Sequence, residues 1–189
     1  LGILIALGEA INRADVAALF IEELKLEEVY EKLNVKTFDT EFKAPKSGLE
    51  METETVVKMA PATDISDHVL RHDIETVIRI GVRGLEPLPN HTFQPDKEIN
   101  RAEYAMMIED ILVKATRDEG LATRFFGSQS PFPDLRSDLP YFNAVMVCTS
   151  RDIMTVANKR TGEFQPMGAV SGADALLAIR ELKEQLRVF

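Results

Sequence analysis

Apolar residues recur along this chain with the spacing of amphipathic helices. In five stretches they return every three or four positions, which places them on one face of a helix. We therefore predict a mainly α-helical chain whose core is built from these faces, with the first helix running on to Leu33. The predicted core positions are Val16, Ala17, Phe20, Ile21 and Leu24; Val69, Ile74, Val77 and Ile78; Ala102, Ala105, Ile108, Ile111 and Leu112; Leu139, Phe142, Val145 and Met146; and Ala173, Leu176, Ile179, Leu182 and Leu186.

The segments between the predicted helices contain residues that interrupt helices. Residues 85–97 include three prolines and cannot be helical throughout, because proline lacks an N–H group and clashes with the preceding turn. Residues 34–61 are largely polar and contain a Pro- and Gly-bearing cluster, so we predict a linker with one short strand at 55–59. A second connector is expected at 116–130, with a short helix near 119–126.

One helix-start signal occurs three times in the chain. The copies read Ile11-Asn12-Arg13-Ala14-Asp15, Ile99-Asn100-Arg101-Ala102-Glu103 and Val170-Ser171-Gly172-Ala173-Asp174. In each, an Asn or Ser can cap the helix, and an acid three residues later can bond back to the N–H group of the cap. This repetition indicates a repeat architecture. A fourth cap is predicted in residues 64–67, and Gly81 is expected to end the helix that follows in a left-handed conformation.

The spacing of other features repeats as well. Phe93 precedes the second start signal by the same interval as Phe164 precedes the third. Asp64 precedes Phe93 by 29 residues, and Asp134 precedes Phe164 by 30 residues. The chain therefore contains two full copies of one unit, and its N-terminal part contains the back half of another.

We predict one domain built from these units. A chain of 189 residues of which 45% are hydrophobic can bury a substantial core. Its parts are expected to be a partial first repeat at 1–33, the linker at 34–61, a second repeat at 62–115, the connector at 116–130 and a third repeat at 131–189. The chain begins at Leu1 within an apolar stretch, so we also expect residues upstream of it, including any signal peptide, to be missing.

The repeated unit resembles the S-layer homology (SLH) motif. In the second repeat the resemblance is carried by Asp64, Ile74, Gly81, Gly84, Phe93, Pro95, Arg101, Ala102 and Glu103. It covers residues 62–115 well, residues 131–187 moderately, and residues 9–27 through the second half of the motif alone. The resemblance implies three motifs around a pseudo-threefold axis, with the repeat helices forming a central bundle.

The resemblance also implies a function in the cell envelope (periplasm, outer-membrane-associated or cell surface). SLH motifs anchor proteins without covalent bonds, through grooves that bind peptidoglycan-linked glycan or a secondary wall polymer, and the Arg of the motif contacts the ligand. This chain departs from the family pattern in two ways, because Gly172 replaces that Arg in the third repeat and the chain has no Trp. A role in a Gram-negative type of envelope, tying an outer-membrane component to peptidoglycan, is therefore as consistent as a Gram-positive wall anchor.

The first helical turns offer a physical basis for binding an anion. Arg13 and Arg101 follow directly after a cap, where free N–H groups and the positive end of the helix dipole favour negative charge. A guanidinium there can hold a carboxylate or phosphate through two parallel bonds. The predicted ligand-binding residues are Arg13, Arg101, Asn12, Asn100, Arg83 and Gly84. In the alternative, the caps are purely structural and Arg101 pairs with Asp96 or Asp64.

Composition disfavours several other functions. The net charge of −9 argues against binding nucleic acid, and no stretch approaches the roughly 20 apolar residues of a membrane span. Cys148 is alone, so an intrachain disulfide is excluded. His68 and His72 have the spacing of metal ligands but lack a third partner, and Phe93 and Phe164 are expected to be core residues. We predict no enzyme, no cofactor, no metal and no membrane insertion by this chain.

Three hypotheses for function follow. The first is a module that binds peptidoglycan or another cell-wall polysaccharide. The second is a scaffold that binds other envelope proteins, with the arginines in internal ion pairs. The third is the targeting appendage of an enzyme whose catalytic domain lies outside this chain.

Overall fold

The computed structural model describes residues 2–33 and 62–187 of the chain. This part is mainly α-helical, as predicted, and contains no β-strand. Its elements are α1 (Gly2–Ala6), α2 (Arg13–Ala18), the π-helical segment η1 (Leu19–Glu23), α3 (Leu26–Leu33), α4 (Arg71–Ile80), α5 (Arg101–Thr116), the 3-10 helix η2 (Glu119–Thr123), α6 (Phe142–Ser150) and α7 (Gly172–Arg187). The predicted linker at 34–61 and its strand at 55–59 lie outside the described residues.

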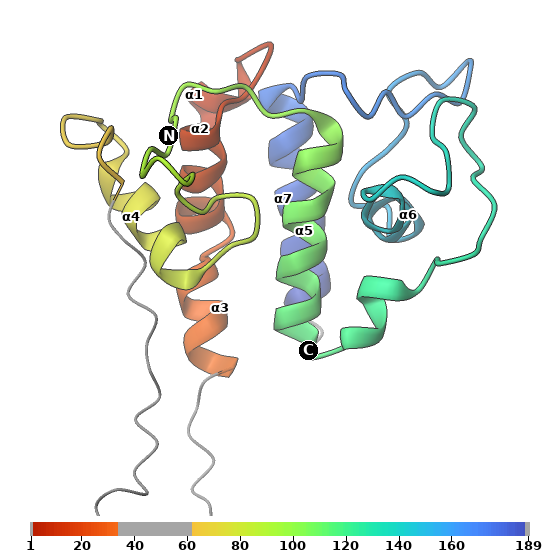
Figure 1. Cartoon of the computed structure of the whole chain (residues 1–189), viewed down its shortest axis with the longest axis horizontal. Helices are drawn as coiled ribbons and strands as arrows, with labels where there is room; N and C mark the ends of the chain where they lie inside the picture. The colour runs from red at the N-terminus through yellow and green to blue at the C-terminus, as the bar shows by residue number, and fades with distance from the viewer. Residues whose placement is uncertain (1, 34–61, 188–189) are drawn as a thin grey trace, which may run out of the picture.

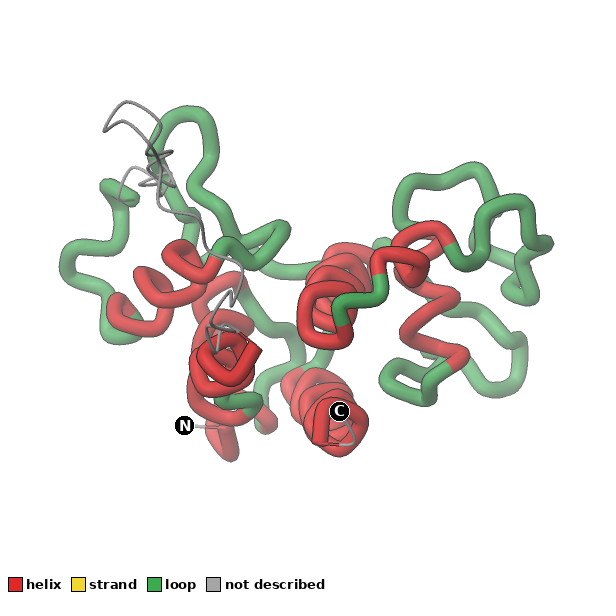
Figure 2. The backbone as a smooth tube through the Cα atoms, turned by 90° about the horizontal axis from the view of Figure 1, so that it is seen from below, coloured by secondary structure: helices red, strands yellow, loops and turns green. Residues whose placement is uncertain are grey.

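Three helices stand side by side in the middle of the molecule: α2 with its continuation η1, α5 and α7 (Figure 1). Seen nearly end on, they mark the corners of a triangle, with α4 and α6 outside it on opposite sides (Figure 2). Tyr104 of α5 is fully buried in this group. Its ring stacks on Phe20 of η1 with 6.2 Å between ring centroids, and its hydroxyl donates to the Ala175 carbonyl of α7 at 3.0 Å. One aromatic side chain therefore contacts all three helices.

A closed ring of main-chain hydrogen bonds joins the residues that precede the three helix starts. The N–H of Ile11 donates to the carbonyl of Val170 (3.0 Å), that of Ile99 to Ile11 (3.0 Å) and that of Val170 to Ile99 (3.4 Å). All three residues are buried, so water cannot replace these bonds without opening the core. Segments far apart in the sequence are thus held in the same way, each donating to one neighbour and accepting from the other.

Two helix starts carry the full capping box that the sequence predicts, and the third carries only the bond to its Ser cap. Both halves of the capping box are present for Asn12 with Asp15 at α2 and for Asn100 with Glu103 at α5. At α7 the Ser171 hydroxyl accepts from the N–H of Asp174 at 3.1 Å. Gly81 ends α4 at φ 76°, the left-handed conformation that was predicted for it.

Each central helix packs against an outer element that belongs to the next repeat. α2 packs against α4, α5 packs against α6, and α7 packs against the short helix α1. The positions predicted to face the core of α5 are all buried, as are Ile74 and Val77 of α4 and Phe142 and Val145 of α6. The repeats therefore interlock in a cycle, and α1 closes it.

α1 packs so closely on α7 that no side chain fits at Gly172. The N–H of Gly172 donates to the carbonyl of Gly8 at 3.0 Å, and a Cβ atom at Gly172 would lie 1.7 Å from the carbonyl oxygen of Ile5. In the third repeat, main chain of α1 thus crowds the position that holds Arg in the first two. The other side of α1 is open, since Ile3 and Leu4 are 79% and 72% exposed.

The first helix does not continue unbroken to Leu33, contrary to the prediction. At η1 the turns widen, and the N–H of Leu24 reaches back to the carbonyl of Leu19. Lys25 then adopts φ 58°, which interrupts the chain before α3 begins. The apolar stripe through Leu24 is nevertheless buried as predicted.

Three further details differ from the prediction. Asp64 does not cap α4, which begins at Arg71 without a side-chain cap, because the Asp64 carboxylate binds a loop instead. Val69 precedes that helix start and is 96% exposed. Ala173 is also exposed, because the buried stripe of α7 begins at Ala175.

Gly172→Ala tests the packing of α1 on α7, because close packing predicts a loss of stability and an open site predicts a gain. Alanine favours a helix over glycine by up to about 1 kcal/mol, so an open site would be stabilised. Because the Cβ atom would collide with the Ile5 carbonyl, we expect overpacking to cost about 1–3 kcal/mol and the thermal midpoint to fall by several degrees. Ala173→Ser, at the exposed neighbouring position, is the control. A higher midpoint for Gly172→Ala would contradict the close packing.

Candidate functional site

Two aspartates hold the loops that lead into the second and third helix starts. The carboxylate of Asp64 accepts the N–H groups of Phe93 and Gln94, both at 2.7 Å. Asp134 binds the loop at Phe164 through the equivalent pair of bonds, at 3.0 and 2.6 Å. Although desolvation raises it, the pKa of Asp64 is lowered overall by these main-chain hydrogen bonds. The repeated spacing in the sequence therefore reflects a shared loop clamp.

Arg13 is buried, and its guanidinium holds the first of these loops. Nε donates to the carbonyl of Phe93 (2.7 Å), Nη1 to that of Gly84 (2.5 Å) and Nη2 to that of Glu86 (3.0 Å). The guanidinium also lies over the Phe93 ring, 4.6 Å from its centroid, in a cation–π contact. Desolvation by burial lowers the pKa of Arg13, and nearby carboxylates oppose this effect. All three nitrogens are thus engaged inside the protein.

Arg101 occupies the same place in the next repeat. Its Nε donates to the carbonyl of Phe164 at 2.8 Å, its Nη2 donates to that of Thr155, and its guanidinium lies 4.5 Å from the centroid of the Phe164 ring. The residue is only 5% exposed. Desolvation lowers the pKa of Arg101, while Asp174 and Asp134 raise it. In contrast to Arg13, its Nη1 has no hydrogen-bond partner within the described part of the chain.

The main-chain N–H groups of the first helical turns are engaged as well. Those of Arg13 and Ala14 donate to the carbonyls of Lys97 and Pro95, and those of Arg101 and Ala102 donate to the carbonyls of Gly168 and Pro166. These groups are not free, so their predicted contribution to anion binding does not apply at the two helix starts. The predicted alternative is right about the cap, since Asn100 and Glu103 form a capping box. Its ion pair is wrong, because within residues 2–33 and 62–187 Arg101 binds carbonyl groups and does not pair with Asp96 or Asp64.

Arg101 lines a pocket of about 240 Å³ where α5 meets α7 and the loop that follows α6. We call it the Arg101 pocket. Its apolar lining comes from Tyr104, Ile153, Met154, Val170 and Leu177, and its polar lining comes from Arg101, Asp152, Thr155, Asp174 and Glu181. It is bounded by segments of both the second and the third repeat, and it combines an apolar surface with converging polar groups, as ligand sites commonly do.

The structure does not bring the six predicted ligand-binding residues together. Gly84 joins Arg13, since its carbonyl accepts from that guanidinium, whereas the Arg83 side chain approaches Glu109 of α5. Asn12 and Asn100 each precede one arginine, and both side chains are committed to capping. Gly84 also adopts φ 87°, which accounts for glycine at that position. Of the six, only Arg101 lines the Arg101 pocket.

The acids of this pocket were missed in the sequence. Asp174, Leu177 and Glu181 recur at intervals of three and four residues and so share one face of α7, which is a signal that the sequence did contain. For Asp174 the sequence pattern predicts only a capping role. Asp152 adopts φ 56° after α6, the left-handed position that Gly81 takes after α4, and no residue pattern marked it.

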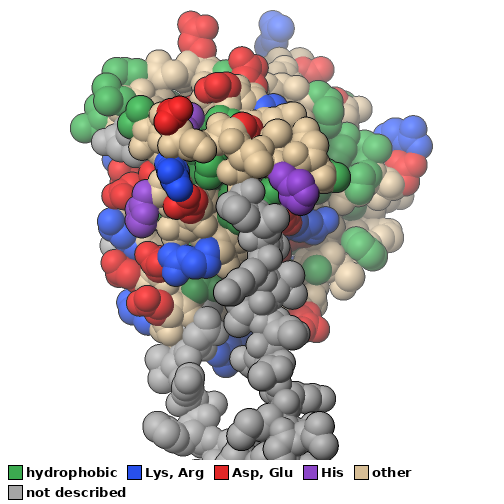
Figure 3. All heavy atoms as spheres, turned by 60° about the vertical axis from the view of Figure 1, so that its left-hand side comes forward, with side chains coloured by type: hydrophobic (Ala, Val, Ile, Leu, Met, Phe, Trp, Pro, Cys, Tyr) green, Lys and Arg blue, Asp and Glu red, His purple; other side chains and the backbone are tan. Residues whose placement is uncertain are grey.

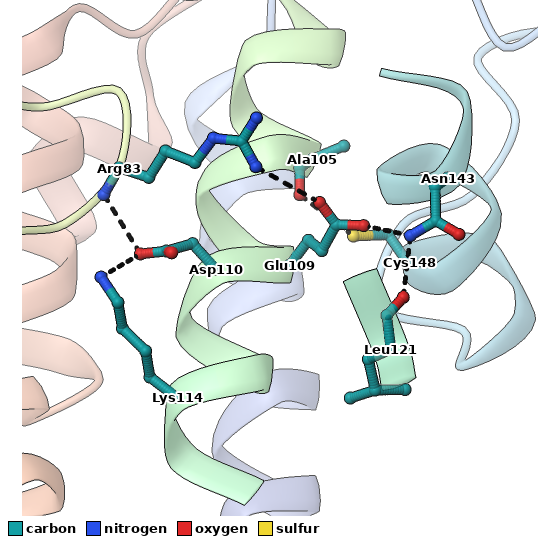
Figure 4. Close-up of polar contacts among 8 residues, drawn as sticks. All are labelled: Arg83, Ala105, Glu109, Asp110, Lys114, Leu121, Asn143 and Cys148. Carbon is teal, nitrogen blue, oxygen red and sulfur yellow. Dashed lines mark hydrogen bonds and ion pairs between the residues drawn. The ribbon is translucent and has the colours of Figure 1, made fainter. Parts of the chain in front are cut away.

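A second polar cluster surrounds Glu109 on α5 (Figure 4). Asn143 of α6 donates from Nδ2 to the Glu109 carboxylate and to the carbonyl of Leu121 at 2.8 Å, which ties α6 and η2 to α5. Arg83 approaches the same carboxylate to 3.9 Å, with its side chain 58% exposed. Desolvation raises the pKa of Glu109, and the Asn143 bond and Arg83 oppose this. The cluster therefore connects helices, and Arg83 belongs to it.

On the α4 side, the surface carries charges of both signs mixed together (Figure 3). Arg71 pairs with Glu75 at 2.7 Å and Arg79 pairs with Glu27 at 2.6 Å, and all four side chains are substantially exposed. Such exposed pairs contribute little to stability. In residues 2–33 and 62–187, no helix combines the length and the apolar character that crossing a membrane requires.

Comparison with known proteins adds no relative. No family model matches the chain, and no curated protein or solved structure matches it. The resemblance to the SLH motif therefore rests on the residues quoted from the sequence and stays a prediction.

Arg13→Lys tests whether the hydrogen bonds from Arg13 to the loop carbonyls stabilise the fold. A lysine ammonium cannot reproduce the planar fork that reaches three carbonyl groups, so buried acceptors would lose their donors. We expect the free energy of unfolding in urea to fall by roughly 2–4 kcal/mol. Arg136→Lys, in an exposed pair with Asp138, should change it by less than about 0.5 kcal/mol. Wild-type stability of Arg13→Lys would mean that this guanidinium does not hold the loop.

Glu109→Gln tests whether the buried, charged carboxylate of Glu109 lowers the stability of the fold. Because the pKa of Glu109 is raised in the folded protein, the folded state binds more protons than the unfolded state between the two pKa values, and stability falls as pH rises through that window. Gln keeps an acceptor for Asn143, so we expect a thermal midpoint about 2–4 °C higher at pH 7 and a shrinking gain toward pH 4. The exposed change Glu119→Gln is the control. A gain that stayed constant with pH would contradict this explanation.

Proposed function

We propose that this chain is a non-catalytic module of the cell envelope that binds a peptidoglycan-associated or secondary cell-wall polysaccharide in the Arg101 pocket. The observation that carries this proposal is the composition of the pocket. Ile153, Met154 and Leu177 supply apolar surface, and charged groups lie beside them. A sugar ring has apolar C–H faces and hydroxyl groups at its edge, so a site for it needs both kinds of contact.

The size of the pocket favours a single sugar unit. Its volume of about 240 Å³ is below the roughly 300–1,000 Å³ of sites for drug-sized ligands. A long polymer can still bind at such a site when one unit enters and the neighbouring units remain outside. The affinity of one module for one unit would then be modest, and several modules on one surface would add to it.

Arg101 suits this role because its position is fixed before a ligand arrives. Two of its nitrogens are held by the carbonyls of Phe164 and Thr155, and its ring contact with Phe164 restrains the plane of the guanidinium. Nη1 is then available to donate to a hydroxyl or ring oxygen. A preorganised donor loses little conformational freedom on binding.

In this proposal the two arginines have different functions. All three nitrogens of Arg13 donate to carbonyl groups, so it serves to hold the repeats together. Only Arg101 combines that role with a place in the pocket wall. The envelope location rests on the SLH resemblance of the repeats, in which the grooves between motifs bind wall saccharides.

The experiment is a pull-down of the purified chain with peptidoglycan sacculi, comparing wild type with Leu177→Arg. Leu177 lines the pocket and is 60% exposed, so a long side chain there should fill the pocket without disturbing the core. An Arg at this position can also pair with Glu181 one turn away on α7. We expect the bound fraction to fall about tenfold or more.

Phe126→Arg is the matched control. Phe126 is 70% exposed, and the substitution adds the same charge away from the pocket. It should bind sacculi as wild type does, and circular dichroism should show all three proteins folded. Equal binding by Leu177→Arg and wild type would reject the pocket as the binding site. Absence of binding by wild type would reject saccharide binding itself.

A further inference from the structure

The Arg101 pocket carries more negative than positive charge. Three carboxylates line it, those of Asp152, Asp174 and Glu181, against the single guanidinium of Arg101. Among the described residues none of these acids takes part in an ion pair with a Lys or Arg side chain. Glu181 accepts only from the neutral amide of Gln185, at 3.0 Å. Asp152 and Glu181 therefore have no cationic partner among the described residues, and Asp174 is opposed only by Arg101.

The positive charge of Arg101 is already partly offset within the protein: desolvation by burial lowers its pKa, and two carboxylates oppose this effect. Asp174 and Asp134 are the carboxylates that act on this guanidinium, and two of its nitrogens donate to carbonyl oxygens. A ligand carboxylate or phosphate would have to compete with these groups and would also face Asp152 and Glu181. An acidic saccharide is thus disfavoured at this site by simple Coulomb repulsion.

We propose that the Arg101 pocket binds a sugar unit that carries a free ammonium group, such as an amino sugar without its N-acetyl group. The ammonium donates to the carboxylates that line α7 and the loop after α6, and a sugar hydroxyl accepts from Nη1 of Arg101. The ring packs against Met154 and Leu177. This inference names the ligand class of the proposed function and rests on it.

The unpartnered Nη1 is the reason to expect a sugar rather than a simple amine. An amine alone would satisfy the carboxylates but would leave Nη1 of Arg101, which is not among the buried unpartnered atoms, bonded to water instead of to the ligand. An amino sugar carries on one rigid ring both an ammonium group, which donates to the carboxylates, and neutral hydroxyl oxygens, which can accept from Nη1. It also covers the apolar wall, which an ammonium ion cannot do.

The experiment is calorimetric titration of the full chain at pH 6 with three oligosaccharides of equal length. They are chito-oligosaccharide with every N-acetyl group present, the same oligosaccharide with every N-acetyl group removed, and an oligogalacturonate. Charge-assisted hydrogen bonds are roughly twice as strong as neutral ones. We therefore expect the de-N-acetylated form to bind at least about tenfold more tightly than the N-acetylated form, which corresponds to 1.4 kcal/mol, and the oligogalacturonate to bind most weakly.

Two double variants separate this site from general attraction, because a protein of net charge −9 attracts any polycation. Asp152→Asn with Glu181→Gln removes two pocket charges; Asn tolerates the left-handed backbone at 152, and Gln keeps the acceptor for Gln185. Asp67→Asn with Asp96→Asn removes two exposed charges elsewhere. We expect the preference for the de-N-acetylated form to disappear in the pocket variant and to persist in the surface variant.

The outcomes distinguish this inference from the proposed function. Equal affinity for the two chito-oligosaccharides, or an equal loss of preference in both double variants, would overturn the inference while saccharide binding stands. Tighter binding of the oligogalacturonate would overturn it in favour of an acidic glycan. Propylamine as a sugar-free probe should bind at least tenfold more weakly than the de-N-acetylated oligosaccharide, and equal affinity would also overturn it. Failure of every saccharide and of sacculi to bind would reject the proposed function as well.

Discussion

Ile11, Ile99 and Val170 each donate a main-chain hydrogen bond to the next of the three, and this closed ring positions everything else in the fold. The ring lies where three helices begin, so it sets the origin of each helix relative to the others. Tyr104 then fixes the same helices further along, through Phe20 and Ala175. Because the ring joins segments separated by some 70 to 160 residues, its formation requires the whole chain and orders the loops at the same time.

The arginines at one position of the repeat hold the loops in both full contacts, and Arg101 also lines the pocket. Arg13 and Arg101 leave equivalent helix starts and reach equivalent loops, which Asp64 and Asp134 clamp from the other side. A buried guanidinium is costly unless its donors are satisfied. Main-chain carbonyls accept from all three nitrogens of Arg13 and from two nitrogens of Arg101. In the third repeat Gly172 stands in place of this arginine, and the main chain of α1 packs directly against it. The three contacts between repeats are therefore closed by two arginines and one helix.

Much of this architecture could be predicted from the sequence, because it depends on local signals. The capping boxes at Asn12 and Asn100, the left-handed Gly81 and the buried stripe of α5 follow from residue type and helical period. The role of Asp64 could not be predicted, because it binds an N–H group 29 residues away and a cap was the nearest use for it. The Arg101 pocket was also beyond local patterns. Its acids come from α7 and from the loop after α6, and only their placement in three dimensions shows that they share a site.

Native-state hydrogen exchange at the amides of Ile11, Ile99 and Val170 tests the central claim most directly. If the ring holds the three helix starts together, these amides should exchange only through global unfolding and report the same free energy as denaturant unfolding, even though they lie in different repeats. The bond from Val170 is the longest at 3.4 Å, so its amide is the most sensitive of the three. Exchange at any one of them through a local opening, many-fold faster than at the other two, would contradict the claim.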